Sequence, residues 1–387
     1  MNYRPCRPDD DAAVRVCIGS SLNISAAVWP DLVRRIGPEN LRVVEADGAV
    51  VAGMAAYRMG QWFGGRSVPC AGVTIVGVAA EHRRKGAAGL MLREMLRELH
   101  AAGEPIAALY ASTQGLYRGV DFEQAGSRCL YDPPLTPRSI NRRELPGGRV
   151  DLGPWGPAGD VARRRGMATN GNLDRTPGLW ERITSMPDRP HVGYIFGSLD
   201  APEGYLISYH DQLSPESARI VVRDMAALTP AAARRLWTLL ADHASYAGSV
   251  RWVGPPSDPL LALPAECKHT PIQLLRWMLR IVRVPEALES RGYAPAAAGE
   301  LHLDLRDDLL PENSGRWVVR ISDGAATVTP GGRGDLTLPV RSLAPLYSGF
   351  LTASELRQLG WLEGPDAVVQ MADQLFAGPA PWMPEIF

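Results

Sequence analysis

A basic turn that contains a glycine stands between a β-branched run and an apolar helical pattern. The run covers residues 73–78, the turn is Arg83-Arg84-Lys85-Gly86, and apolar residues recur at helical spacing over residues 90–99. A strand, a basic glycine turn and a helix in this order aim several backbone N–H groups and the positive end of the helix dipole at one point. Because Gly86 has no Cβ, the backbone there can approach a bound group closely. The pattern predicts a pyrophosphate site.

The spacing Arg83-x-x-Gly86-x-Ala88 resembles the acetyl-CoA signature of GNAT acetyltransferases. A P-loop is excluded because no Ser or Thr follows Lys85, and the turn lacks the G-x-G-x-x-G dinucleotide pattern. The resemblance implies that acetyl-CoA binds at this turn.

A second copy of the spacing occurs at residues 163–168, as Arg163-Arg-Arg-Gly166-Met-Ala168. No β-run precedes it, and the residues that follow, Thr-Asn-Gly-Asn, do not continue a helical pattern. We therefore interpret this copy as a loop and expect only the Arg83 turn to bind CoA.

Length and charge limit the class of protein. A chain of 387 residues is expected to form two or three domains. Its formal net charge of −1 gives no overall attraction to nucleic acid or to an anionic membrane. The sequence has no transmembrane-length apolar stretch, and its N-terminus lacks the apolar core of a signal peptide. We expect a cytoplasmic protein that binds neither nucleic acid nor membrane.

The cysteines and histidines do not form a recognisable pattern. Five scattered cysteines contain no C-x-x-C pair, and the seven histidines contain no H-x-x-x-H pair. Neither a disulfide framework nor a metal site is predicted.

The first predicted domain covers residues 1–135. An Asp-rich start precedes a helix, residues 41–57 form a hairpin around Asp47-Gly48, and the helix after the basic turn ends at Gly103. A buried strand follows at residues 106–111. This β-β-β-α-β order is that of a GNAT core.

The second predicted domain covers residues 136–284. Residues 132–160 are rich in Pro and Gly and are predicted to be a linker and domain entry. Three strand-like segments then precede a helix with Thr229 as N-cap and Pro230 at its first position. The same order without a basic turn predicts a second GNAT-like fold that has no CoA site of its own.

The third predicted domain covers residues 285–387. Four segments between residues 301 and 338 alternate with period two, as half-buried antiparallel strands do. Helices are predicted at residues 340–347, 352–359 and 365–376.

Acetyl transfer to an amine needs a polarised carbonyl, a base for the ammonium proton and an acid for the leaving thiolate. The backbone N–H of Val78, at the end of its strand, is a candidate donor to the acetyl oxygen, while Val76 and Val78 could equally be core residues. Tyr117 follows the next strand in a Y-x-x-x-G-F-like context in which Asp121 replaces Gly. Its phenol could protonate a thiolate, although a Tyr after a strand can also simply pack.

Several further segments resemble the enhanced intracellular survival (Eis) acetyltransferases. They are Gln61 to Pro69, Val76 to Gly86, Gly115-Leu-Tyr117, Trp277 to Val282 and the terminal Phe387. The resemblance covers the whole chain. It implies an α/β fold with tandem GNAT domains and a sterol-carrier-protein-like α+β domain, acetyl-CoA as cosubstrate, amine acceptors such as aminoglycosides, and a homo-hexamer.

The resemblance also implies residue roles. Val76, Val78, Arg83, Arg84, Gly86 and Ser112 would contact CoA, with Ala88 completing the signature. Tyr117 would be the general acid, and the α-carboxylate of Phe387 the general base. A chain terminus often frays, but the apolar Trp382, Met383 and Ile386 favour a buried tail.

Three residues are candidates for the acceptor pocket. Trp29 lies where GNAT folds shape that pocket but could be a core residue, and Tyr110 ends the strand before Tyr117. Glu385 could attract an ammonium group or could be solvated.

The main hypothesis is therefore an acetyl-CoA-dependent N-acetyltransferase for an amine-bearing small molecule. One alternative is a protein or peptide lysine acetyltransferase. The other is a lipid-binding or scaffold protein with a vestigial GNAT site.

Overall fold

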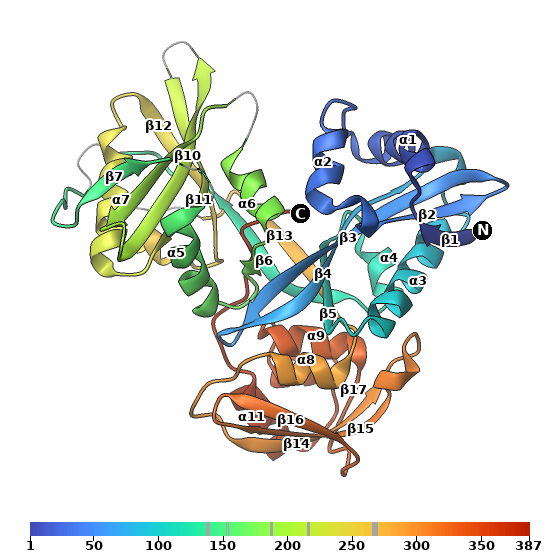
Figure 1. Ribbon diagram of the computed structural model, residues 1–387. Helices are drawn as coiled ribbons and strands as arrows, with labels where there is room; N and C mark the ends of the chain where they lie inside the picture. Colours follow the sequence, from blue (N-terminus) through green and yellow to red (C-terminus); the bar gives the residue numbers. More distant parts are fainter. Residues whose placement is uncertain (137–139, 152, 154, 186–188, 215–216, 265–269) are drawn as a thin grey trace. The chain divides into compact units, whose positions relative to one another are not determined.

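The computed structural model describes residues 1–136, 140–151, 153, 155–185, 189–214, 217–264 and 270–387 (Figure 1). Cys267 and Lys268 lie outside the described residues. The chain divides into two compact units. One contains residues 1–126, 276–379 and 386–387, and the other contains residues 127–275 and 380–385.

A mixed sheet forms the core of the first unit, in the order β1-β2-β3-β4-β5-β13. Among the strands that the structure describes in this sheet, β4 and β5 are the one parallel pair, and the other neighbours are antiparallel. At the predicted hairpin turn, Asp47 and Gly48 both have left-handed φ angles of 52° and 78°, as a tight two-residue turn requires. The strands are β1 Asn2–Pro5, β2 Leu41–Ala46, β3 Ala49–Phe63, β4 Arg66–Val78, β5 Ile106–Tyr110 and β13 Gln273–Ile281.

Helices cover both faces of this sheet, as the side-chain alternation of β2 shows. Val43 packs with α1 and α2, whereas the next residue, Val44, packs with α3 on the opposite face. The predicted helix after the basic turn is confirmed as α3, and Gly103 beyond its end has φ 81°. The helices are α1 Asp11–Leu22, α2 Trp29–Ile36, α3 Ala87–Ala101 and α4 Gln114–Arg118.

The third predicted segment contributes a separate four-stranded sheet to the same unit, in the order β16-β15-β14-β17. The four strands and the three later helices are confirmed near their predicted positions, but the strands are not all antiparallel as expected, because β17 runs parallel to β14. The elements are α8 Val284–Ser290, β14 Gly299–Arg306, β15 Gly315–Ser322, β16 Ala325–Pro330, β17 Leu336–Pro339, α9 Val340–Ser348, α10 Ala353–Gln358 and α11 Asp366–Leu375.

A fully buried ion pair connects this segment to the first sheet. Arg280 of β13 donates from one Nη to both carboxylate oxygens of Asp307, each at 2.8 Å. Asn313 Nδ2 donates to the same carboxylate at 2.8 Å. A buried charge is stable only when an opposite charge and hydrogen bonds replace its hydration. The pair therefore fixes the loop after β14 against β13.

The second unit repeats the plan of the first, with its sheet in the order β6-β12-β11-β10-β9-β7. Here too one pair, β11 and β12, is parallel, and helix α7 connects its two strands. The strands are β6 Glu123–Tyr131, β7 Gly147–Val150, the short β8 Leu173–Asp174, β9 Val192–Gly197, β10 Pro202–Ser214, β11 Ser217–Ala227 and β12 Ala247–Gly254.

One prediction for this unit gains detail and another needs correction. The stretch 132–160, predicted to be a linker and domain entry, contains strand β7, which pairs with β9 in the sheet of the second unit. The second Arg-x-x-Gly-x-Ala copy is not a loop: it forms the end of helix α5, Gly156–Met167. That helix packs Ala158 and Val161 in a cluster with Tyr205 of β10, so tertiary packing overrides the weak helix propensity of its glycines. The other helices are α6 Pro177–Thr184 and α7 Pro230–Asp242.

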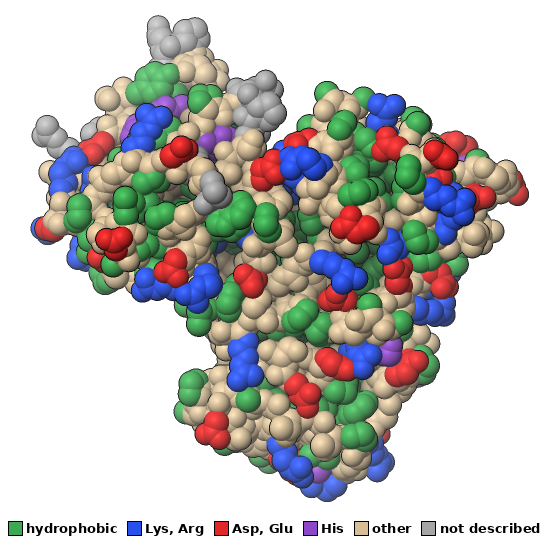
Figure 2. Space-filling view, viewed as in Figure 1, with side chains coloured by type: hydrophobic (Ala, Val, Ile, Leu, Met, Phe, Trp, Pro, Cys, Tyr) green, Lys and Arg blue, Asp and Glu red, His purple; other side chains and the backbone are tan. Residues whose placement is uncertain are grey.

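The surface carries interspersed charges. On the face shown in Figure 2, acidic and basic side chains alternate with apolar ones, as the formal net charge of −1 leads one to expect. Among the described residues, none of the helices combines the length and apolar character needed to span a bilayer.

Candidate active site

Strand β4 carries a bulge in the segment that was predicted to face the cosubstrate. The register passes from Gly53↔Gly77 to Ala55↔Thr74, so residues 75 and 76 of β4 oppose one residue of β3. Ile75 has φ 48°, a left-handed conformation that strains a β-branched residue. Such bulges redirect the backbone, frequently beside active sites.

The backbone N–H of Val78 points away from β3. Val78 is opposite Ala52, and the next residue, Ala79, donates its N–H to Val51 O at 2.9 Å. Val78 therefore belongs to a non-hydrogen-bonded pair, whose N–H groups face the other side of the strand. On that side, β5 pairs with β4 only through residues 70–72. Among the residues that the structure describes, no acceptor is found for the N–H of Val78, which lies beyond the end of the β4–β5 ladder.

The basic turn combines exposed arginines with two left-handed residues. Arg83, Arg84 and Lys85 are exposed, and Arg84 and Gly86 have φ angles of 61° and 88°. An ideal Cβ on Gly86 would meet nothing within 4 Å. The glycine is therefore required by its backbone conformation.

The first turn of α3 presents donors without protein acceptors. The first intrahelical bond is from Leu90 N–H to Gly86 O at 2.9 Å, and no side chain caps the helix at Gly86. Within the described chain, the N–H groups of residues 87–89, including Ala88, have no hydrogen-bond acceptor. With the helix dipole they form an anion site, beside which Arg83 Nε donates to Val78 O at 3.3 Å.

Tyr117 lies in the short helix α4, with its ring edge-on to Phe122 at 6.1 Å between centroids. Its side chain is 7% exposed, and burial raises the pKa of its phenol to about 12. No hydrogen-bond acceptor for that phenol is found among the described residues. Asp121, which stands where a Gly is usual, adopts φ 64°, a conformation that Asp tolerates. The turn closes, because Phe122 N–H donates to Tyr117 O at 3.1 Å.

Phe387 lies against β4 in the first unit. An ideal Cβ on Gly72 would stand 2.8 Å from both Phe387 Cε2 and Met59 Cε. The ring of Tyr110 meets the ring of Phe387 edge-on at 6.3 Å between centroids. The structure thus brings together Tyr110 and Phe387, while Ser112 is exposed just after β5.

Comparisons with known proteins match the three segments separately. Residues 16–125 match the acetyltransferase (GNAT) domain family, residues 171–281 match a second acetyltransferase (GNAT) domain family, and residues 284–384 match the sterol carrier protein domain family. The predicted fold class, tandem GNAT folds followed by a sterol-carrier-protein-like domain, is confirmed.

Curated relatives match almost the whole chain. The N-acetyltransferase Eis of Mycobacterium bovis is 30% identical over 384 residues, which cover 92% of this chain and 90% of that protein. The chain belongs to the Eis N-acetyltransferase family. An uncharacterized N-acetyltransferase of Streptomyces avermitilis is 28% identical over 84% of this chain and 83% of its own length.

Solved structures agree with the assignment of this chain to an acetyltransferase family. A GCN5-related N-acetyltransferase from Anabaena variabilis superposes with a TM-score of 0.96 at 34% identity, over 100% of both chains. Eis1 from Mycobacterium abscessus shares the fold with a TM-score of 0.82 at 23% identity, also over 100% of both chains. The protein is thus a GNAT N-acetyltransferase.

Two residues of this Eis-family chain that were candidates for the acceptor pocket, Trp29 and Glu385, are buried and bonded to other protein side chains. Trp29 is 2% exposed, packs with Val14 and Ile18, and donates its indole N–H to Asp11 Oδ1 at 2.8 Å. This is a core position. Glu385 belongs to the second unit and is not solvated there, because its carboxylate is buried and forms an ion pair with Arg175.

The second GNAT domain of the Eis-family chain starts its corresponding helix differently. The Thr229 side chain accepts from Ala232 N–H at 3.1 Å, and Pro230 has no N–H to offer. The Thr229 hydroxyl also donates to the carboxylate of Glu203 at 2.6 Å. A capped helix start beside a carboxylate is unsuited to a pyrophosphate.

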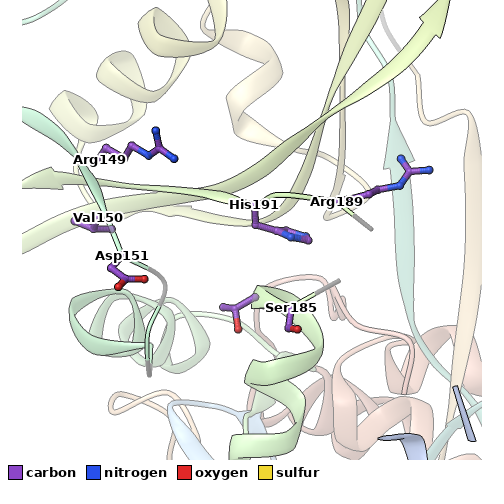
Figure 3. Close-up of a pocket in the computed structure, with 7 residues that line it drawn as sticks. Arg149, Val150, Asp151, Ser185, Arg189 and His191 are labelled. Carbon is purple, nitrogen blue, oxygen red and sulfur yellow. The ribbon is translucent and has the colours of Figure 1, made fainter. Parts of the chain in front are cut away.

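This second unit also contains a wide-mouthed pocket of about 640 Å³. Figure 3 shows Arg149 and Val150 on β7, Ser185 just beyond α6, and His191 next to the start of β9. Burial and the nearby Arg223 lower the pKa of His191. The acetyl-CoA-type features described above all belong to the first unit, so we assign no part in acetyl transfer to this pocket.

Sequence analysis missed two features of the site. One is Gly72, although a glycine inside a strand of β-branched residues often indicates that another group packs closely against the backbone. The ion pair between Arg175 and Glu385 was also missed, because no local pattern connects residues 210 positions apart.

Proposed function

We propose that this Eis-family enzyme transfers an acetyl group from acetyl-CoA to a primary amine of a small molecule, such as an aminoglycoside. The observation that carries the proposal is the open N–H of Val78 beyond the β4 bulge, followed by the uncapped start of α3. Neither a lipid-binding protein nor a scaffold would need this pair of features. We propose domain boundaries at residues 1–135, 136–284 and 285–387.

The cosubstrate site fits the groups that the first unit offers. Arg83, Arg84 and the N–H groups of residues 87–89 would bind the pyrophosphate, with Gly86 allowing close approach, Ala88 inside the first turn of α3 and Ser112 near the thiol end. Val76 and Val78 would pair with the pantetheine arm by backbone hydrogen bonds. The capped start of α7 supports one such site per chain.

Acetyl-CoA supplies the acetyl group as an activated thioester. The Val78 N–H would stabilise the negative charge that develops on the acetyl oxygen. As the amine nitrogen bonds to the carbonyl carbon and the C–S bond breaks, the Phe387 carboxylate would accept the ammonium proton. Tyr117, whose phenol is protonated at neutral pH and whose pKa burial raises further, would give its proton to the departing sulfur. Tyr110 would shape the acceptor side, and Trp29 would support it from the core.

Calorimetry with acetyl-CoA and a thiol-release assay test the proposal. We expect saturable acetyl-CoA binding, and release of CoA with aminoglycosides at a higher kcat/KM than with lysine peptides or folded proteins. A preference for protein lysine would contradict the small-molecule assignment. A folded protein that neither binds acetyl-CoA nor releases thiol with any amine would overturn the enzymatic account and favour a lipid-binding or scaffold role. Light scattering would measure the hexamer that the family resemblance implies.

A further inference from the structure

The residues just before the C-terminus are an integral part of the second unit. Ser127 of β6 donates its N–H to Pro381 O and accepts from Met383 N–H, both at 3.0 Å. Trp382 is thereby paired with Ser127 in a parallel bridge. The tail, residues 380–385, therefore continues the hydrogen bonding of β6.

A second set of bonds fixes the tail from the loop between α5 and β8. Trp382 donates its N–H to Asn170 O at 3.0 Å, and Asn172 Nδ2 donates to Trp382 O at 2.9 Å. Arg128 Nε donates to Pro384 O at 3.2 Å. Each residue from 381 to 384 thus has a main-chain group bound within the second unit.

A buried charge network follows at Glu385. The Glu385 side chain is 6% exposed and forms an ion pair with Arg175, which is 3% exposed. Arg175 Nη1 also lies 2.5 Å from Asp224 Oδ2, and the Tyr205 hydroxyl donates to the same carboxylate. Two arginines and two carboxylates balance one another here, as burial demands.

The second arginine of the network comes from the unexpected copy of the CoA spacing. Arg165 of α5 donates to Asp224 Oδ1 at 2.8 Å, and its guanidinium lies 5.6 Å from the ring centre of Trp382. Arg165 lies inside this segment but is not one of the signature positions, so the segment contributes to holding the tail through a residue that the spacing does not specify.

We propose that the second GNAT domain serves the reaction as an anchor for the tail, with Arg175 acting through Glu385 as a positioning residue for Phe387. The proposal deepens the proposed function, because it rests on the Phe387 carboxylate being the base. Only Ile386, itself 38% exposed, stands between Glu385 and Phe387. Two residues reach at most about 7 Å, so fixing Glu385 restricts where Phe387 can go and removes conformational freedom in advance.

Carboxypeptidase digestion of the full chain, followed by intact mass, tests the anchoring independently of activity. We expect Glu385→Gln and Arg175→Met to release Phe387 about tenfold faster than the wild type, since each removes a charge-assisted bond. Arg175→Lys, which keeps the charge, should lie between Arg175→Met and the wild type. Asp132→Asn is the matched control: Asp132 also pairs with two arginines, Arg219 and Arg251, away from the tail. Unchanged digestion of the folded Glu385→Gln and Arg175→Met variants would overturn the anchor.

Kinetics in two backgrounds test the positioning. We expect Glu385→Gln to lower kcat by about 10²-fold and to leave the acetyl-CoA Kd unchanged, because the residues proposed to bind CoA belong to the first unit. In a chain that lacks residues 386–387, the same substitution should lower kcat no further, since the positioned group is already gone. A purely structural role would lower kcat equally in both backgrounds, and that result would overturn the proposal. If the truncated chain keeps full activity, the base assignment itself fails; acetyl-CoA binding without any turnover in the wild type would refute the proposed function instead.

Discussion

The ring of Phe387 occupies the space where Gly72 has no side chain. A Cβ on Gly72 would meet Phe387 Cε2 and Met59 Cε, both at 2.8 Å, closer than van der Waals contact allows. Gly72 also forms the last rung of the β4–β5 ladder, opposite Ala108. The β4–β5 ladder therefore ends at Gly72, the same residue against which the ring of Phe387 packs.

Gly72→Ala should displace the ring of Phe387. We expect kcat to fall by about 10²-fold from misplacement of the base, while the acetyl-CoA Kd stays the same. Adding Phe387→Leu, which keeps the carboxylate on a smaller side chain, should restore part of the activity. Gly148→Ala is the control, since that strand glycine has nothing within 4 Å of its ideal Cβ. Steady-state kinetics decide: equal kcat in the wild type and Gly72→Ala would mean that Phe387 is not seated as described.

Gly86→Ala should weaken acetyl-CoA binding. Gly86 has φ 88° at the start of α3, and Gly103 has φ 81° beyond its end, both in open space. Alanine at either position costs about 1 kcal/mol of folding stability through strain. Only at Gly86 should the change also disturb the N–H groups of the pyrophosphate site. We expect similar melting temperatures for Gly86→Ala and Gly103→Ala, with a higher acetyl-CoA Kd in calorimetry for Gly86→Ala alone; equal Kd values would contradict the site.

Much of the fold could be predicted, because it follows from local patterns. The hairpin at Asp47-Gly48 and the helix capped by Thr229 depend on residues that are neighbours in the sequence. Helix α5 could not be predicted in this way: its Gly-rich sequence is helical because Ala158 and Val161 pack on the sheet of the second unit. The buried pair of Arg175 and Glu385 joins residues that no local pattern relates.

In the candidate site, too, the features that follow from local sequence could be predicted and those that depend on pairing with distant residues could not. Its turn and helix were predicted from the spacing of Arg83, Gly86 and Ala88. The bulge at Ile75 was not, because the β-branched run 73–78 has the pattern of an ordinary buried strand. The register shift arises from pairing with β3, which the strand's own sequence does not encode.

Tyr117→Phe should remove the proposed general acid with little change in packing. We expect kcat to fall by about 10²- to 10⁴-fold and the acetyl-CoA Kd to stay the same, because the ring remains. Tyr131→Phe is the matched control, since Tyr131 is also buried but donates its hydroxyl to Pro255 O at 2.6 Å in the second unit. Wild-type kcat in Tyr117→Phe would reassign Tyr117 to packing.

The Tyr117 phenol should also make folding sensitive to alkaline pH. Its pKa is raised to about 12 by burial alone, whereas an exposed phenol in the unfolded chain titrates near pH 10. Above pH 10 the unfolded state loses this proton and the folded state retains it, so stability is full below pH 10 and is lost as pH rises toward 12. The slope for one such group is at most about 1.4 kcal/mol per pH unit. Urea unfolding at pH 9, 10 and 11 should show a shallower decline for Tyr117→Phe than for the wild type; parallel curves would contradict the raised pKa.

Two adjacent aspartates should differ sharply in their effect on stability. Asp307 is fully buried and accepts from Arg280 and Asn313, whereas the side chain of Asp308 is 74% exposed and pairs with Arg306 at the surface. Asp307→Asn leaves the buried Arg280 guanidinium with only the more distant carboxylate of Asp121, 4.0 Å away, and the loss of the closer partner costs about 3–5 kcal/mol. Asp308→Asn removes an exposed pair worth at most about 1 kcal/mol. Differential scanning calorimetry should therefore show a large fall in Tm for Asp307→Asn and almost none for Asp308→Asn. Double replacement of Arg280 and Asp307 by Met and Leu should recover much of the lost stability, because it removes both charges together; a Tm no higher than that of Asp307→Asn would mean that the pair contributes by geometry that apolar side chains cannot supply.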